Sequence, residues 1–164
     1  MTHKELVLIA ERWVKKNASC GVVLRELRSY TNETPDVIGF GSHGHSVVVE
    51  CKRTRSDFFA DKGKRSRIEG AGMGEYRLYL TPRGLVKPED LPMGWGLLEV
   101  AENGKVLRTV DTIRWKPDRK RFTPNRLAER AVMYSVLRRM AIRGHIKNVY
   151  LSARAALAEK EEEV

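Results

Sequence analysis

The apolar residues of the chain recur with two different periods, one typical of helices and the other typical of strands. Across residues 3–17 they return every three or four positions behind Thr2, a favourable N-cap, which predicts a helix. Short β-branched segments separated by turn residues follow, and they predict strands at residues 20–28, 35–40 and 46–52. The chain is therefore expected to begin with one helix and a three-stranded meander.

A second helix is expected to separate the third strand from a fourth. Ser56 is a favourable N-cap, and the helix is expected to run to about Arg67 despite Gly63. The later elements are expected to be a strand over residues 76–80, a hairpin of residues 95–101 and 105–110 around Asn103-Gly104, a helix from Pro124 to Gly144, and a further helical stretch from Lys147.

The order helix, three strands, helix, strand predicts an α/β fold with a mixed sheet. A helix between the third and fourth strands lets the fourth run parallel to an earlier one, while hairpins keep their strands antiparallel. A chain of 164 residues is long enough for one domain with a substantial core. We expect residues 1–112 to form an αβββαβ core with an added hairpin, and residues 113–164 to form a basic helical extension packed on the same domain.

Strand pairing is expected to bring three acidic residues into one row. Facing residue numbers in an antiparallel pair have a constant sum, and the hairpin of the second and third strands then places Asp36 opposite Glu50. The preceding hairpin places Glu26 opposite Asp36 by the same reasoning. Lys52 follows Glu50 by two residues and projects from the same face, whereas Cys51 points to the other face.

Opposed carboxylates in a sheet repel at Cβ separations of about 5 Å, so such a row is expected only where a cation lies between its members. A hard divalent ion fits, because Mg²⁺ prefers oxygen ligands and can be held by one or two carboxylates together with substrate phosphate oxygens. Two alternatives stay open. A glutamate and a lysine two residues apart on a strand are common by chance, and Glu26 could instead pair with an arginine across the sheet surface.

The formal net charge of +10 indicates a polyanionic partner. The excess is concentrated in residues 113–147, which contain 11 basic and 2 acidic residues. The side chains expected to contact backbone phosphates are Lys62, Lys64, Arg65, Arg67, Arg119, Lys120 and Arg121. DNA is the expected partner, although phosphate contacts alone would serve RNA equally. The alternative is a basic surface that is simply solvated.

The two cysteines, Cys20 and Cys51, provide no disulfide framework, which is typical of a reducing cytoplasm. The sequence has no apolar run of the roughly 18 residues that a membrane span needs. Its N-terminus leads straight into an amphipathic helix without a signal-peptide pattern. We therefore expect a cytoplasmic protein that contacts no membrane.

The segment from Glu50 to Lys62, together with Asp36 and the aromatic strand at residues 76–79, resembles the PD-(D/E)xK nuclease superfamily, and more narrowly the MmcB-type DNA-repair nucleases and related phage proteins. The resemblance covers roughly residues 20–110 and implies a restriction-endonuclease-like core with Mg²⁺ or Mn²⁺ as cofactor. It also implies these roles: Asp36 and Glu50 as metal ligands, the backbone carbonyl of Cys51 as another ligand, Lys52 near the attacking water, and Glu26 at a position where the group tends to carry an acid.

Two functions from different classes agree with these features. The first is a metal-dependent deoxyribonuclease, expected to be an endonuclease of repair, recombination or phage nucleic-acid metabolism. The second is a nuclease-fold protein that binds nucleic acid or inhibits a partner without cleavage. The clustered acids favour the first, because a pure binder has no need of carboxylates that repel phosphate. A homodimer formed through the C-terminal helices is a further hypothesis, since cutting both strands of a duplex often uses two sites.

Overall fold

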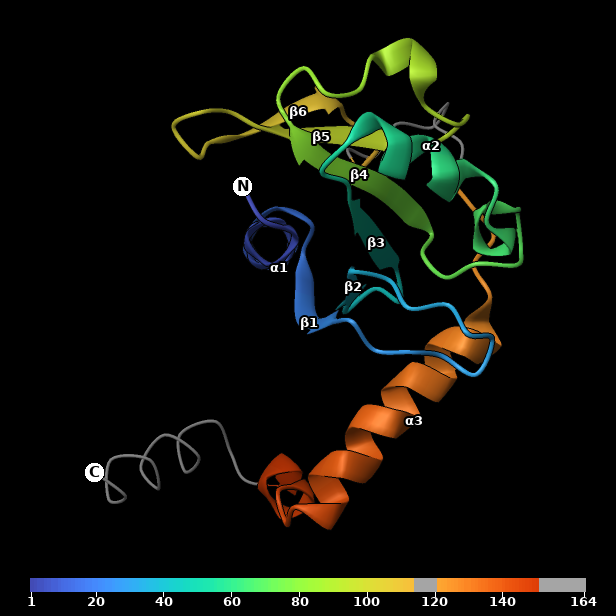
Figure 1. Ribbon diagram of the computed structural model, residues 1–164. Coiled ribbons are helices and arrows are strands. Elements are labelled where there is room, and N and C mark those ends of the chain that lie inside the picture. The colour runs from blue at the N-terminus through green and yellow to red at the C-terminus, as the bar shows by residue number, and fades with distance from the viewer. Residues whose placement is uncertain (114–120, 151–164) are drawn as a thin grey trace.

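The computed structural model describes residues 1–113 and 121–150, which form an α/β fold around one six-stranded mixed sheet (Figure 1). The strands lie side by side in chain order: β1 (Cys20–Arg25), β2 (Val37–Gly41), β3 (Ser46–Cys51), β4 (Tyr76–Pro82), β5 (Gly96–Val100) and β6 (Val106–Val110). The β3–β4 and β4–β5 pairs are parallel, and the other three pairs are antiparallel. The expected mixed sheet is confirmed.

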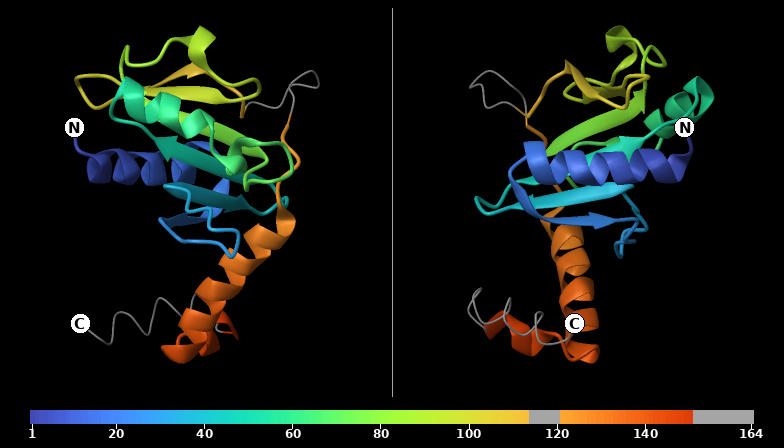
Figure 2. Two further views of the ribbon diagram at one scale, coloured as in Figure 1. Left: turned by 45° about the vertical axis from the view of Figure 1, so that its right-hand side comes forward. Right: turned by 90° about the vertical axis from the view of Figure 1, so that its left-hand side faces the viewer.

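The N-terminal helix α1 (His3–Asn17) covers one face of the sheet, and α2 lies on the other (Figure 2). A capping box of Thr2 and Glu5 starts α1, as the sequence predicted for its N-cap. The helix packs its apolar stripe on the side chains of β3 that point toward it, which include Val47, Val49 and Cys51. These positions alternate with Glu50, the one charged residue of β3, which therefore faces the opposite side, toward α2.

The helix α2 (Arg55–Lys62) is shorter than the sequence predicted. Thr54, not Ser56, is its N-cap, because the Thr54 hydroxyl accepts a hydrogen bond from the Asp57 amide. The helix ends at Gly63, and residues Arg65–Arg67 form a separate 3₁₀ turn, η1, instead of continuing it. Glycine is unfavourable in a helix interior, and the end of α2 at Gly63 agrees with this preference.

The buried one of the two aromatic side chains of α2 anchors the helix to the sheet. Phe58 is fully buried and meets the ring of Tyr79 edge to face, at a centroid distance of 4.9 Å. The Tyr79 ring in turn stacks on Trp95, with centroids 4.4 Å apart. Aromatic pairs of this kind add to the free energy of burial and fix the orientation of the helix over β4.

The C-terminal helix α3 (Arg126–Ile142) has Asn125 as its N-cap and begins two residues after Pro124, the predicted first helical residue. Its first turns pack against the sheet, with Ala128 and Val132 in the cluster that contains Ile38 and Val48. Beyond Val132 no side chain of α3 is buried, and the helix runs away from the sheet (Figure 1). The expected extension packed on the domain is therefore packed only at its beginning.

The chain after α3 continues into a short 3₁₀ turn, η3 (Ile146–Tyr150). The rest of the helical stretch expected from Lys147 lies outside the described residues. No helix within residues 1–113 and 121–150 is both long enough and apolar enough to cross a membrane.

Candidate active site

Asp36 lies immediately before β2, and its carboxylate is held against the end of β3. Its Oδ2 accepts a hydrogen bond of 2.7 Å from the backbone N–H of Cys51, and its Oδ1 lies 3.3 Å from Nε2 of His3 on α1. Burial raises the pKa of Asp36, against the lowering effects of the Cys51 amide and of His3. The structure thus brings Asp36 to the Glu50–Lys52 segment, as strand pairing predicted. His3 was missed, because only folding places α1 beside this edge.

Glu50 and Lys52 share one face of the sheet, as their spacing predicted, and both are buried. The Nζ atom of Lys52 lies 3.6 Å from Oε2 of Glu50. Burial raises the pKa of Glu50 to about 7, although Arg67 and Lys52 oppose this effect. Burial would lower the pKa of Lys52, but the carboxylates of Glu50 and Asp61 outweigh it and raise that pKa. Lys52 is therefore a buried ammonium next to an acid that titrates near neutrality.

Asp61, in the last turn of α2, is the residue around which the charged groups gather, although no motif in the sequence predicted this role. Its side chain is fully buried and accepts hydrogen bonds from Nζ of Lys52 at 2.9 Å, from Nε of Arg67 at 2.6 Å and from the hydroxyl of Tyr79 at 3.0 Å. Burial raises the pKa of Asp61, but the hydrogen bonds from Arg67 and Lys64 outweigh it and hold that pKa well below its usual range. One signal was available: Asp61 follows the buried Phe58 by three residues and so shares its helix face.

Arg67 was expected to contact phosphate, but its side chain is only 6% exposed and is paired with protein carboxylates. Its guanidinium donates to Asp61, lies 3.1 Å from Oε2 of Glu50, and lies 3.8 Å from Oε1 of Glu33. The guanidinium carbon also lies over the ring of Trp95 at 5.2 Å from its centroid. In this arrangement Arg67 is an internal counter-ion.

Glu33, in the connection between β1 and β2, is a fourth buried carboxylate. Its Oε2 accepts a hydrogen bond of 2.8 Å from the backbone N–H of Met73. Its Oε1 finds no hydrogen-bond partner among the residues that the structure describes. Burial raises the pKa of Glu33, while the Met73 amide and Arg67 lower it. No sequence pattern marked this residue, because its place depends on the path of a loop.

Glu26 lies near Asp36, as the predicted row requires, but it is exposed, unlike the buried Glu50. Its backbone N–H donates to the carbonyl of Asp36 at 3.2 Å, so the predicted register holds. However, β1 ends at Arg25 because Glu26 has a left-handed φ of 51°. Its side chain is 62% exposed, and its Oε1 lies 4.0 Å from Nε2 of His3, the atom that also lies 3.3 Å from Oδ1 of Asp36. The described side chain closest to the Glu26 carboxylate in an ion-pair geometry is thus a histidine, and not the arginine of the alternative.

Two of the remaining phosphate candidates lie at the end of α2. Lys62 places its ammonium over the rings of Phe58 and Phe59, at 5.2 and 5.0 Å from their centroids. Lys64 is 57% exposed and reaches Asp61 at 2.7 Å. Because Lys64 is both exposed and close to the buried acids, it is the candidate best placed to meet a phosphate near them.

The other candidates lie further from the acids or outside the described residues. Arg121 pairs with Glu75 at 3.1 Å and lies over the ring of Tyr76. Arg65 belongs to η1, and its side chain is not described. Arg119 and Lys120 lie outside the described residues.

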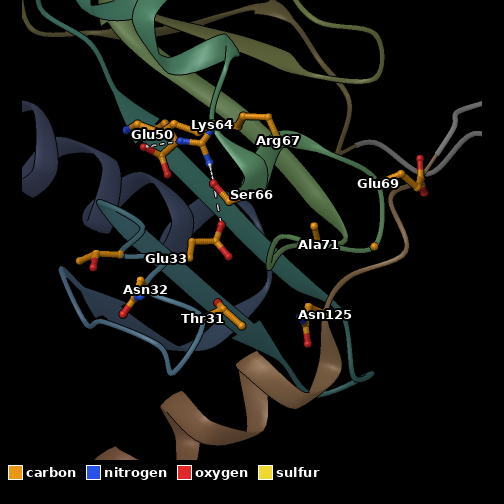
Figure 3. Close-up of a pocket in the computed structure, with 12 residues that line it drawn as sticks. Thr31, Asn32, Glu33, Glu50, Lys64, Ser66, Arg67, Glu69, Ala71 and Asn125 are labelled. Atoms are coloured by element: carbon orange, nitrogen blue, oxygen red, sulfur yellow. Dashed lines mark hydrogen bonds and ion pairs between the residues drawn. The ribbon is translucent and has the colours of Figure 1, made fainter.

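A cavity of about 890 Å³ opens beside Glu50. Its walls are formed by residues 31–34, by the segment from Lys64 to Ala71, and by Asn125 at the start of α3. Figure 3 shows Glu50, Lys64 and Arg67 close together at one end of the cavity, and Thr31 and Asn125 at the other. A space of this size can take a nucleotide-sized ligand.

The donor chemistry of the site suits a hard divalent ion. Asp36 and Glu50 offer carboxylate oxygens, while the thiol of Cys51 is buried on the α1 face and away from them. Within residues 1–113 and 121–150, no three His, Cys, Asp or Glu side chains are grouped so that they could hold a metal ion. The positive charge next to Glu50 is instead supplied by Lys52 and Arg67.

A solved structure with a similar fold is the SPO1766 protein of unknown function from Silicibacter pomeroyi. The two folds superpose with a TM-score of 0.57 at 22% sequence identity, and the match covers 87% of this chain and 92% of that chain. A scan against protein-family models and a search of curated proteins gave no match. The comparison therefore shows a shared α/β fold with an N-terminal helix, a six-stranded mixed sheet and a C-terminal helix.

Proposed function

We propose that the protein is a metal-dependent nuclease that hydrolyses phosphodiester bonds of DNA on a restriction-endonuclease-like core of the PD-(D/E)xK type. The observation that carries this proposal is the contact of Asp36 with the backbone of the Glu50–Lys52 segment, a 2.7 Å hydrogen bond to the Cys51 amide. It sets two carboxylates and a buried ammonium at the end of β3, beside a cavity. We expect an endonuclease that acts in the cytoplasm, in keeping with its two free cysteines.

Asp36 and Glu50 are the residues that would hold the divalent ion. When bound, such an ion supplies Lewis-acid polarisation of the attacked phosphodiester and neutralises part of its charge. The two carboxylates bring hard oxygen donors, and burial keeps bulk water away from them.

Lys52 is the group of the chain that would meet the reacting phosphate or the attacking water. Its ammonium donates one hydrogen bond to Asp61 at 2.9 Å and lies 3.6 Å from Glu50, next to the place where a phosphate bound at Glu50 would lie. A charged donor fixed in a dry site stabilises negative charge that develops on phosphate oxygens, and no reorganisation is needed. Asp61 is thus a positioning residue, itself held by Tyr79 and Arg67.

The proposal is tested by nicking of supercoiled plasmid with Mg²⁺ or Mn²⁺. We expect the wild type to cleave and Asp36→Asn and Lys52→Met to lose on the order of 100-fold or more in rate, because each removes a charge that acts on the reacting phosphate. Asp90→Asn is the matched control, since Asp90 pairs with Arg55 in a surface salt bridge away from the site. A wild type that cleaves no faster than Asp36→Asn with either metal would overturn the nuclease assignment.

One observation favours a second candidate function, a nucleic-acid-binding protein without cleavage. Lys52 and Arg67 already neutralise Glu50, and a carboxylate paired in this way repels phosphate less than a bare one. The same experiment decides between the two candidates. A gel shift of DNA by the wild type, without metal-dependent nicking, would favour the binder.

A further inference from the structure

Arg67 is the guanidinium that contacts the buried acids beside the cavity. Its NH2 atom lies 3.1 Å from Oε2 of Glu50 and 2.8 Å from Oδ1 of Asp61. Its NH1 atom lies 3.8 Å from Oε1 of Glu33. One guanidinium thus contacts three carboxylates, two of which, Glu33 and Glu50, line the cavity with it (Figure 3).

The pairing with Glu33 is incomplete. The Glu33 side chain is 5% exposed, yet its Oε1 has no hydrogen bond within the described part of the chain, and the nearest cation that forms an ion pair with it, Arg67, is 3.8 Å away. A buried carboxylate oxygen without a donor is costly. This oxygen belongs to a residue that lines the cavity beside Glu50, so the acids retain capacity for a positive ligand that Arg67 does not fill.

We propose that Arg67 is an exchangeable counter-ion: a divalent ion that binds at Glu50 displaces its guanidinium, which turns into the adjoining cavity and meets a phosphate of the substrate. This inference rests on the proposed function and adds a coupling to it. Metal binding and phosphate binding would then favour each other, since the metal releases the residue that binds the phosphate.

Asp61 would not be left without donors if Arg67 moved away. Asp61 would keep its hydrogen bonds to Lys52 and Tyr79 and its ion pair with Lys64. A divalent ion held by Glu50 would compete with the Arg67 guanidinium for the same carboxylate, and its two charges would add to the repulsion that Lys52 already exerts there.

The backbone around Arg67 would allow this residue to move. Arg67 lies in the three-residue turn η1, so its displacement would break no long helix. It also lines the cavity already, which gives the freed side chain a place to go.

The first test uses the unmodified protein and NMR spectroscopy of arginine Nε–H groups. On saturation with Mg²⁺, the Arg67 signal should shift and lose protection from solvent exchange, because its hydrogen bond to Asp61 is broken. Arg77 is the matched control, since it is equally buried and its Nε donates to the carbonyl of Gly74. If Mg²⁺ moves the backbone signals of Asp36 and Lys52 but leaves the Arg67 signal unchanged, the inference is wrong.

The second test measures Mn²⁺ affinity by the electron paramagnetic resonance signal of the free ion. Arg67→Gln should bind Mn²⁺ about tenfold more tightly than the wild type, because a competing charge is removed. Arg55→Gln, in a surface salt bridge with Asp90, should leave the affinity unchanged. Equal or weaker binding by a folded Arg67→Gln contradicts the inference.

The outcomes separate this inference from the proposed function. Metal-dependent nicking together with a static Arg67 overturns the exchange and leaves the nuclease intact. Absence of both nicking and Mn²⁺ binding in every variant overturns the nuclease, and the exchange with it.

Discussion

Asp61 is buried and still charged, because donors surround it on every side that faces the site. Four donors from different parts of the chain meet at this one carboxylate. They are Lys52 at the end of β3, Lys64 at the end of α2, Arg67 in η1 and Tyr79 in β4. A buried acid that serves several cations stabilises them only while it keeps its charge. The position of Lys52 therefore depends on a residue outside the acidic row that strand pairing predicted.

Asp61→Asn is expected to lower the free energy of unfolding by about 3–5 kcal/mol, because it leaves Lys52 and Arg67 buried without a full counter-charge. Urea denaturation at pH 7.5 measures the change. Asp57→Asn is the control on the same helix: Asp57 is half exposed and only 4.0 Å from Lys52, so its loss should cost about 0.5 kcal/mol or less. Equal losses in the two variants would show that Asp61 has no special role.

The raised pKa of Glu50 predicts that stability falls as the pH rises. Burial disfavours its charged form, so the folded state holds the proton to a pKa of about 7, whereas the unfolded chain releases it near 4.5. The contribution of Glu50 to the free energy of unfolding is therefore fully present below pH 4.5 and is lost as the pH rises through 7.

Between pH 5 and pH 8 this difference in pKa is expected to remove roughly 2–3 kcal/mol of the free energy of unfolding. Glu50→Gln should show a smaller fall over the same interval, as measured by urea denaturation at both pH values. If the free energy of unfolding of Glu50→Gln falls as much as that of the wild type between the two pH values, the prediction is wrong.

Residues on paired strands could be placed from the sequence, and residues held by loops could not. Ile38 faces Val48, and the amide of Glu26 meets the carbonyl of Asp36, as the pairing sums require. From that register the sequence predicted that Asp36 and Glu50 lie close together. Glu33 and Arg67 reach the same place through loop paths, which no residue period encodes.

At the scale of elements, the break after α2 matters more than the helix itself. A helix that ran through Gly63 to Arg67, as the sequence predicted, would have carried that arginine onward along the helix axis. The turn at Gly63 and the short η1 instead bring it back toward Asp61. Helix propensity identified Gly63 as an unfavourable helix residue. It did not predict that the helix would end there, because one glycine in a helix costs only about 1 kcal/mol.

The helix α3 is a basic arm. From Arg130 to Tyr150 the sequence contains five arginines and lysines and no acidic residue. The first turns are fixed by the buried Glu129, which accepts hydrogen bonds from the hydroxyl of Ser46 and the amide of Gly74. Asn125, at the start of the arm, lines the cavity beside Glu50. A polyanion bound along α3 would thus lead toward the candidate active site.

Replacing Arg138, Arg139 and Arg143 together by glutamine is expected to weaken DNA binding. If each contacts a phosphate, the slope of log K against log salt should fall by about 2–3. Fluorescence anisotropy with a labelled duplex at several salt concentrations measures this slope. Replacing Arg12, Lys15 and Lys16 on α1 removes the same charge elsewhere, and an equal loss there would point to net charge and not to the arm.

The whole molecule consists of a sheet body and a helical arm that leaves it. The buried residues of α3 end at Val132, so deletion of residues 134–164 should change the free energy of unfolding of the body by less than about 1 kcal/mol. The same deletion should weaken DNA binding while hydrolysis of a small phosphodiester such as bis(p-nitrophenyl) phosphate persists. Urea denaturation and a colorimetric assay measure the two properties, and loss of both would contradict this division.

The same deletion tests the proposed homodimer. Sedimentation velocity of the full chain and of the truncated chain should give a dimer and a monomer if the C-terminal helices join two copies. A full chain that sediments as a monomer at micromolar concentration would contradict that proposal.

The strands lie in the sheet in the order in which they occur in the chain. During translation, each new strand therefore meets a neighbour that has already left the ribosome, and no strand must be inserted between two others. The nascent sheet can grow from one side only, by successive addition. At every stage its newest strand is a bare edge, and a pause after β3 or β4 would be the moment at which the unfinished protein is most exposed to aggregation.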